Sequence, residues 1–214
     1  MKLKSMLGLA ATTVLLASAA NAQSYLLNFD AGLSGSLANA QAPSGLSFHY
    51  GELQDVTDEF GDPTGISNWG IDLTAPAVTV QNPNFYGYGD APSLQNALDC
   101  VFSPTLVLFT TPVDLSSFSI TLDNSSFGTL GLLNIEFYRS AVSGPDTLLA
   151  SLPIDQTVPG FLASIGAISG VDKIVLPSGA LYDNLSASVV PEPATVGLLG
   201  LGLLGLGWQA RRKP

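Results

Sequence analysis

The sequence predicts an all-β fold for residues 23–189, and three observations support this prediction. Short apolar or alternating runs are separated by Gly, Pro, Asn, Asp and Ser, with no amphipathic helical pattern of useful length. In Phe118–Leu122 apolar and hydroxyl side chains alternate, as they do in a half-buried strand. The chain has 22 glycines and 14 prolines, which suit frequent turns, so the many short strands favour a β-sandwich or jelly roll.

Each of these runs predicts one strand. Around residue 136 the alternation is less regular, but Ile135 and Phe137 share a face opposite Glu136 and Tyr138. In chain order the expected strands are Tyr25–Phe29, Leu46–Tyr50, Ala77–Gln81, Thr105–Thr111, Phe118–Leu122, Leu130–Arg139, Thr147–Leu152, Val171–Leu176 and Ala180–Val189. No internal repeat is visible, so we expect one extracellular domain over residues 23–189.

The first 22 residues follow the pattern of a secretory signal peptide. Lys2 and Lys4 precede an apolar run, and Ala20 and Ala22 supply the small residues of a cleavage site. The apolar run is too short to span a membrane comfortably, and small and polar residues follow it. We therefore expect export by the general secretion machinery and a mature chain that begins at Gln23.

Residues 190–214 combine three features in a meaningful order. A Pro-Glu-Pro sequence, which cannot continue a helix, makes a stiff junction that a peptidase can reach. The uncharged stretch 194–208 reaches only about 22 Å as a helix, against a hydrocarbon core of roughly 30 Å. A basic end then keeps the terminus in the cytoplasm and places residues 23–190 outside. The motif and basic residues are Pro191, Glu192, Pro193, Arg211, Arg212 and Lys213.

With these parts in this order, the segment resembles a PEP-CTERM sorting signal, found on exported proteins of many exopolysaccharide-producing Gram-negative bacteria. The resemblance covers about the last 25 residues. It implies transient anchoring by the C-terminal helix and recognition by an exosortase, a membrane transpeptidase-like processing enzyme. Removal of the tail and delivery to the cell surface or extracellular matrix would follow. The alternative is an ordinary C-terminal membrane anchor, which the short apolar segment disfavours.

The distribution of charge restricts the partners of the exported region. Residues 23–190 hold sixteen acids and only two bases, Arg139 and Lys173, a formal net charge of −14. Such a charge disfavours nucleic acid and anionic lipid as partners. It offers carboxylates to divalent cations, but it does not name a ligand.

The middle of the chain also resembles the jelly-roll ectodomains common among PEP-CTERM proteins and related to carbohydrate-binding modules. The resemblance rests on Leu27–Asp30, Val113–Ile120 and Leu181–Ser186. In similar jelly rolls an acid near the first strand and an Asp-Asn pair near the last share a structural calcium. The resemblance gives these roles to Asp30, Asp183 and Asn184, whose oxygens suit a hard cation. The favoured alternative is an exposed carboxylate beside an Asx-stabilised turn.

Aromatic residues suggest a second candidate site. Phe85, Tyr86 and Tyr88 lie among turn-forming residues, an arrangement that suits stacking against a sugar ring. A core-capping loop is the favoured alternative, because aromatic side chains more often serve packing. The same two interpretations apply to Trp69, a sugar-stacking residue or a core residue, and for the same reason burial in the core is favoured.

Catalytic motifs are absent from the sequence. His49 is the single histidine, and neither a Gly-x-Ser-x-Gly elbow nor a glycine-rich phosphate loop occurs. The acidic residues that follow Tyr50 do not have the spacing of an EF-hand, so no motif supports a metal site there. We expect this segment to be a solvated loop. These acids are Glu52, Asp55, Asp58, Glu59 and Asp62.

Cys100 is the single cysteine of the chain, so it cannot form an intramolecular disulfide. Its apolar neighbours predict that the side chain is buried. The alternative is a free thiol that pairs with a cysteine of another molecule.

We therefore expect an exported, non-catalytic surface or matrix protein with a structural or adhesive role. A carbohydrate-binding, lectin-like module is the first alternative, with exopolysaccharide as its candidate partner. A glycan-active hydrolase is the second, because glycoside hydrolysis needs only two suitably spaced carboxylates and sixteen acids are available.

Overall fold

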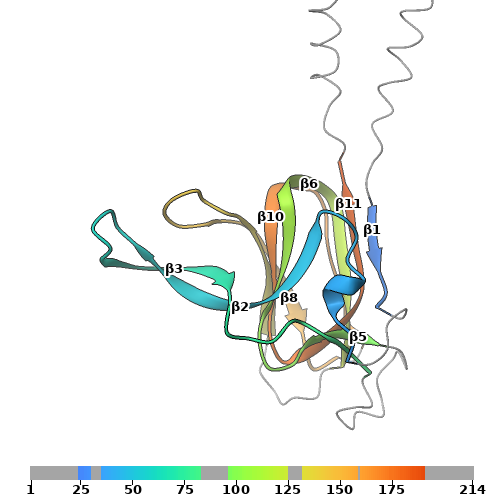
Figure 1. Ribbon diagram of the computed structural model, residues 1–214. Helices are drawn as coiled ribbons and strands as arrows, with labels where there is room; N and C mark the ends of the chain where they lie inside the picture. The colour runs from blue at the N-terminus through green and yellow to red at the C-terminus, as the bar shows by residue number, and fades with distance from the viewer. Residues whose placement is uncertain (1–23, 30–34, 83–95, 125–131, 159, 191–214) are drawn as a thin grey trace, which may run out of the picture. The chain divides into compact units, whose positions relative to one another are not determined.

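The computed structural model describes residues 24–29, 35–82, 96–124, 132–158 and 160–190 (Figure 1). Residues Ser24–Val189 form one compact unit. The described residues contain eleven strands and one short 3-10 helix, η1, and no α-helix. The predicted all-β class is therefore confirmed.

All strand pairs are antiparallel. The main order of the sheet is β4-β5-β11-β6-β10-β7-β8, with β1 added to β11, β9 and β2 added to β6, and β3 added to β2. The elements are β1 Ser24–Leu27, η1 Ala38–Ala40, β2 Leu46–Thr57, β3 Pro63–Ile71, β4 Val80–Gln81, β5 Ala97–Cys100, β6 Thr105–Asn124, β7 Leu132–Arg139, β8 Thr147–Asp155, β9 Leu162–Ile165, β10 Ile168–Leu176 and β11 Ala180–Val189.

The long strand β6 joins the parts of the sheet. Its first part pairs with β2 and β10, and its later part pairs with β9 and β11. We expected two separate strands here, Thr105–Thr111 and Phe118–Leu122, and that prediction was wrong. The register between β6 and β10 shifts between Leu108 and Val113. Pro112 therefore lies at an irregularity, where a sheet tolerates the missing N–H.

The core forms from the apolar faces that the alternation predicted. Phe118, Ile120 and Leu122 are buried, as are Ile135 and Phe137. The rings of Phe118 on β6 and Phe137 on β7 meet edge to face at 5.1 Å, although these strands do not pair with each other. Side chains from strands that do not pair therefore belong to one core.

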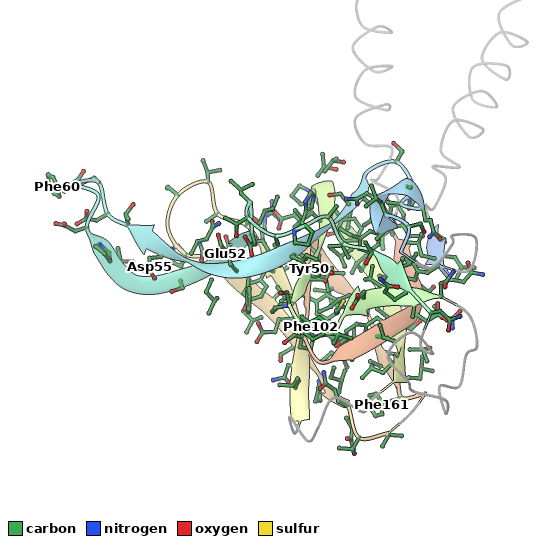
Figure 2. The ribbon with its side chains drawn as sticks, turned by 60° about the horizontal axis from the view of Figure 1, so that its bottom comes forward. Tyr50, Glu52, Asp55, Phe60, Phe102 and Phe161 are labelled. Carbon is green, nitrogen blue, oxygen red and sulfur yellow. The ribbon has the colours of Figure 1, made fainter. Side chains whose placement is uncertain are left out.

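Three strands, β3, β5 and β9, were missing from the prediction. β3 is rich in Gly, Ser and Asn, and its first five residues are exposed, so its pairing with β2 stabilises it rather than burial. β2 itself continues beyond Tyr50 to Thr57. The predicted acidic loop is therefore a hairpin, with the acids exposed on β2 and in the turn, and Phe60 lies at its far end (Figure 2).

Candidate functional site

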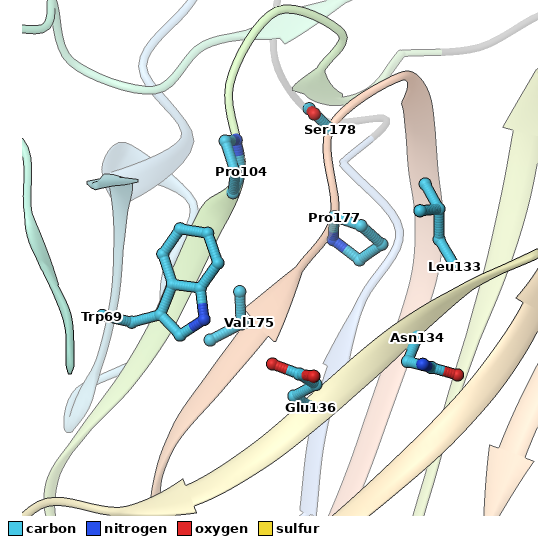
Figure 3. Close-up of a pocket in the computed structure, with 8 residues that line it drawn as sticks. All are labelled: Trp69, Pro104, Leu133, Asn134, Glu136, Val175, Pro177 and Ser178. Atoms are coloured by element: carbon cyan, nitrogen blue, oxygen red, sulfur yellow. The ribbon is translucent and has the colours of Figure 1, made fainter. Parts of the chain in front are cut away.

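A pocket of about 420 Å³ lies beside Trp69, at the base of the β2–β3 hairpin (Figure 3). This size falls within the usual range for small-ligand sites. Its apolar lining comes from Trp69, Pro104, Leu133, Val175 and Pro177, and its polar lining from Asn134, Glu136 and Ser178. The residues belong to β3, β7, β10 and the segments before β6 and after β10, so the tertiary fold assembles the site.

Strand register places part of this lining on the outer face of the sheet. Val175 on β10 pairs with Glu136 on β7, and Lys173 pairs with Tyr138. Residues between these positions, such as Phe137, point into the core. Glu136 and Tyr138 therefore lie on the face opposite the core, as their alternation predicted.

Trp69 is held in place through its backbone and its neighbour. The Nζ atom of Lys173 donates a hydrogen bond to the Trp69 carbonyl oxygen. The side chain of Asn68 accepts a hydrogen bond from the Asp146 N–H at 2.8 Å and donates one to the Gly144 carbonyl at 3.0 Å. Trp69 is only half-buried and lines the pocket, so the prediction that it lies in the core was wrong. Trp69 lies on β3 and pairs with Leu53 on β2, at the base of the hairpin and outside the core.

An ion pair supports this arrangement. Lys173 Nζ lies 2.6 Å from Asp146 Oδ2, and the two side chains are only 9% and 6% exposed. Lys173 is one of the two bases in residues 23–190. Because burying charges is costly unless they are paired and hydrogen-bonded, Lys173 serves the structure here and does not present a free positive charge.

Glu136 is oriented by Tyr138. The Tyr138 hydroxyl donates a hydrogen bond to Glu136 Oε2 at 2.7 Å. Burial raises the pKa of the Tyr138 phenol, and this hydrogen bond raises the pKa further, so the phenol remains a donor at neutral pH. The pocket thus combines an indole, an apolar wall, one carboxylate, one amide and one hydroxyl, which suits a small ligand bearing several hydroxyl groups.

A smaller pocket of about 300 Å³ contains His49, Tyr50 and Asp72 in its lining. Its polar groups are engaged within the protein. Asp72 Oδ1 accepts hydrogen bonds from the N–H and hydroxyl of Thr74, and these bonds hold the pKa of Asp72 below its ordinary value. The Tyr50 hydroxyl donates to the Asp99 carbonyl, and His49 Nε2 lies 3.2 Å from Ser47 Oγ.

The calcium candidates are only partly described. The first and last strands lie side by side, with Leu27 opposite Leu185. Asp183 is buried, and its carboxylate accepts hydrogen bonds from the Asn184 N–H at 2.7 Å and the Asn184 side-chain amide at 3.1 Å. Asp30 lies outside the described residues, within which no group of three acids, histidines or cysteines is placed to hold a metal. The calcium site stays a prediction, and calorimetric titration with millimolar calcium tests it.

The other predicted site residues also lie outside the described part of the chain. They are the signal-peptide residues 1–22 with Ala20 and Ala22, the aromatic residues Phe85, Tyr86 and Tyr88, and the sorting residues Pro191, Glu192, Pro193, Arg211, Arg212 and Lys213. Over the ranges that the structure does describe, no helix has the length and apolar character needed to cross a membrane.

Sequence comparison identifies the C-terminal segment. Residues 189–213 match the family model of the PEP-CTERM protein-sorting motif. The chain therefore carries this motif, and the resemblance noted at the Pro-Glu-Pro and the basic end is confirmed. The motif implies an exported protein that an exosortase processes, with membrane anchoring by the C-terminal region. No curated protein matches the chain.

Sequence reasoning weighed a sugar-stacking role for Trp69 but favoured the core, and it missed the other residues of this pocket. Glu136 and Asn134 lie 67 and 65 positions further along the chain than Trp69, so no local motif connects them. One signal was available: Trp69 is the single tryptophan of residues 23–190, and it follows a run of turn-forming and polar residues rather than an apolar run. An aromatic residue in such a context is a candidate for a ligand site as well as for the core.

Proposed function

We propose that the domain ahead of the sorting motif is a non-catalytic structural or adhesive protein of the cell surface or extracellular matrix. The observation that carries this proposal is that the sorting motif, matched over residues 189–213, begins where the last strand, β11, ends at Val189. An exosortase-processed domain would function outside the cell, and the signal peptide predicted over the first 22 residues supports the same route. The formal charge of −14 on residues 23–190 favours solubility of the exported domain.

We also propose that this domain folds as a β-sandwich or jelly roll. A β-sandwich or jelly roll is supported by the two sets of partners along β6. It is also supported by the contact of Phe118 with Phe137, which come from strands that do not pair. Such a fold gives a rigid framework with loops at its ends, and this framework suits a matrix component.

The intact mass of the protein recovered from cells and medium tests this proposal. We expect the mature protein to lack the first 22 residues and everything beyond the Pro-Glu-Pro region when the exosortase is present, and to keep the tail when it is absent. A variant with both Pro191→Ala and Pro193→Ala is the matched control, and it should keep its tail in both strains. A wild-type mature form that retains Trp208 and Arg211 would show a permanent anchor and contradict the proposal.

A saccharide-binding module is the second candidate, and the pocket beside Trp69 is the observation in its favour. Saturable binding of the domain to particular glycans on an array would distinguish this module from a purely structural protein.

The third candidate, a glycan-active hydrolase, has less support. Glu136 is the one carboxylate among the described residues that line this pocket, whereas glycoside hydrolysis uses two. Release of reducing ends from purified exopolysaccharide would support the hydrolase instead.

A further inference from the structure

We propose that the pocket beside Trp69 binds a neutral sugar residue of a polysaccharide, with the sugar ring stacked on the indole and its hydroxyl groups hydrogen-bonded to Glu136 and Asn134. This proposal rests on the proposed function in one respect, because export brings the pocket to extracellular polysaccharides. It differs from the aromatic loop predicted from the sequence, since it uses other residues and another part of the fold.

The apolar part of the pocket fits one face of a sugar ring. Trp69 is half-buried and lines the pocket together with the buried Val175 and with Pro177 (Figure 3). A tryptophan offers a large, flat, rigid surface, and the C–H groups on one face of a hexose ring can lie against it. The pocket volume of about 420 Å³ accommodates a small ligand. The indole therefore provides the contact area for binding.

The polar part of the pocket fits hydroxyl groups. Glu136 is a hydrogen-bond acceptor, and Asn134, which is exposed on the same strand two residues earlier, provides both donor and acceptor atoms. The hydrogen bond from Tyr138 occupies Glu136 Oε2 and limits the motion of the carboxylate. A sugar hydroxyl can donate to the carboxylate and accept from the amide, so these groups would orient the ring.

The charge of the site selects a neutral ligand. Of the two bases in residues 23–190, Arg139 is not among the pocket residues, and Lys173 is paired with Asp146. An anionic sugar would meet the Glu136 carboxylate without a compensating cation, within a domain of formal charge −14. Like charges placed together oppose binding. Uronic acids and phosphorylated or sulfated sugars are therefore disfavoured.

The fold holds the stacking residue in place before a ligand arrives. The Trp69 carbonyl accepts a hydrogen bond from Lys173, and Asn68 ties the same strand to the loop before β8. Since a rigid site loses less conformational entropy on binding, this support favours affinity. Lys173 and Asn68 act as positioning residues, and neither is proposed to touch the sugar.

Tryptophan fluorescence tests the proposal directly, because Trp69 and Trp208 are the two tryptophans of the chain. In the full chain carrying Trp208→Phe, Trp69 is the single reporter. We would titrate this protein with short oligosaccharides of glucose, mannose and galactose, and with oligogalacturonate as the anionic probe. We expect a saturable change in emission with at least one neutral series, and binding of oligogalacturonate at least about tenfold weaker than the best neutral probe.

Three variants, measured by calorimetry with the best neutral probe, locate the site. Trp69→Leu and Glu136→Gln should each weaken binding at least about tenfold, because they remove the stacking surface and the charged acceptor. Phe60→Leu is the matched control on the same hairpin, and its affinity should equal that of the parent protein. Circular dichroism of each variant verifies that the fold is retained. If Trp69→Leu unfolds the protein, Trp69→Phe replaces it, with weaker binding again expected.

Several results would overturn the proposal: no saturable change with any neutral series, tighter binding of oligogalacturonate, or unchanged affinity in the Trp69 or Glu136 variants. None of these results bears on the intact mass of the processed protein, so the mass measurement tests the sorting proposal independently of sugar binding. Conversely, a retained tail with intact sugar binding would contradict the sorting proposal and leave this site standing.

Discussion

Lys173 and Asp146 form an ion pair at 2.6 Å in which both side chains are almost excluded from solvent. Lys173 lies on β10, and Asp146 immediately precedes β8. The same Lys173 ammonium also donates to the Trp69 carbonyl on β3. Lys173, one of the two bases in residues 23–190, thus connects three segments that are distant in the sequence. These contacts hold Trp69 at the pocket that it lines.

Breaking this ion pair should destabilise the fold strongly. Lys173→Met leaves the Asp146 carboxylate buried without its partner, and we expect a loss of about 3 kcal/mol in the free energy of unfolding. Adding Asp146→Leu should recover much of this loss, because no unpaired charge then remains. Urea denaturation measures both variants.

The matched control for this prediction is Arg139→Met, which removes the other base of residues 23–190 at an exposed position. It should change the unfolding free energy by less than about 0.5 kcal/mol. A Lys173 variant as stable as the Arg139 variant would mean that the buried pair contributes little.

The contact between Phe118 and Phe137 predicts the effect of truncating one ring. Phe137→Ala removes a fully buried side chain and leaves a cavity, so we expect a loss of about 3–5 kcal/mol in unfolding free energy. Phe102→Ala is the control, because Phe102 is an exposed phenylalanine. Thermal or urea unfolding compares the two, and equal effects would contradict the assignment of Phe137 to the core.

The backbone at Asn184 predicts a preference for glycine over alanine. Asn184 has a φ angle of 51°, at a register irregularity between β11 and β6. Asn184→Ala and Asn184→Gly both remove the side-chain amide, but only the alanine keeps a Cβ, which opposes this conformation. We expect the alanine variant to be about 1 kcal/mol less stable than the glycine variant. Urea denaturation that places the alanine variant at equal or higher stability would argue against the left-handed backbone.

Burial of Cys100 predicts an unreactive thiol. The side chain is fully buried, and this burial raises the pKa of the thiol, which keeps it protonated. We expect no labelling by iodoacetamide in the native protein and complete labelling in urea, as measured by mass spectrometry. A disulfide-linked dimer under native conditions would support the intermolecular pairing that the sequence left open.

Asp155 should titrate below the ordinary aspartate pKa of 3.8. Its Oδ1 accepts hydrogen bonds from the Thr157 hydroxyl at 2.5 Å and the Thr157 N–H at 2.9 Å, and both bonds favour the charged form. Because the folded-state pKa is the lower one, the resulting stability is present above pH 3.8 and is lost as the pH falls through the folded-state pKa. NMR titration of the carboxyl carbon measures this pKa.

The variant Thr157→Val removes the side-chain hydrogen bond and should move the Asp155 pKa upward. Asp72 is the internal control, since its hydrogen bonds come from Thr74 and Ala75 and its pKa should stay low. An Asp155 pKa that does not respond to Thr157→Val would exclude this hydroxyl as the cause.

Local patterns predicted the strands whose side chains alternate and face the core. Phe118–Leu122 and Ile135–Phe137 are examples, and the last strand, Ala180–Val189, has the predicted bounds. The prediction failed where pairing, rather than alternation, creates the strand. β3 is stabilised by its partner β2 despite a polar sequence, and β6 continues through Pro112 because its neighbouring strands support both of its parts.

The sequence by itself determined the sorting motif and the all-β class, because a linear motif and the period of side-chain alternation are both properties of neighbouring residues. Only the tertiary structure decided where Trp69 lies and which groups surround it. Trp69, Glu136 and Lys173 come together through strand register and a buried ion pair between distant segments. Such long-range pairing reflects the free energy of the whole packed domain, and no local stretch of the chain encodes it.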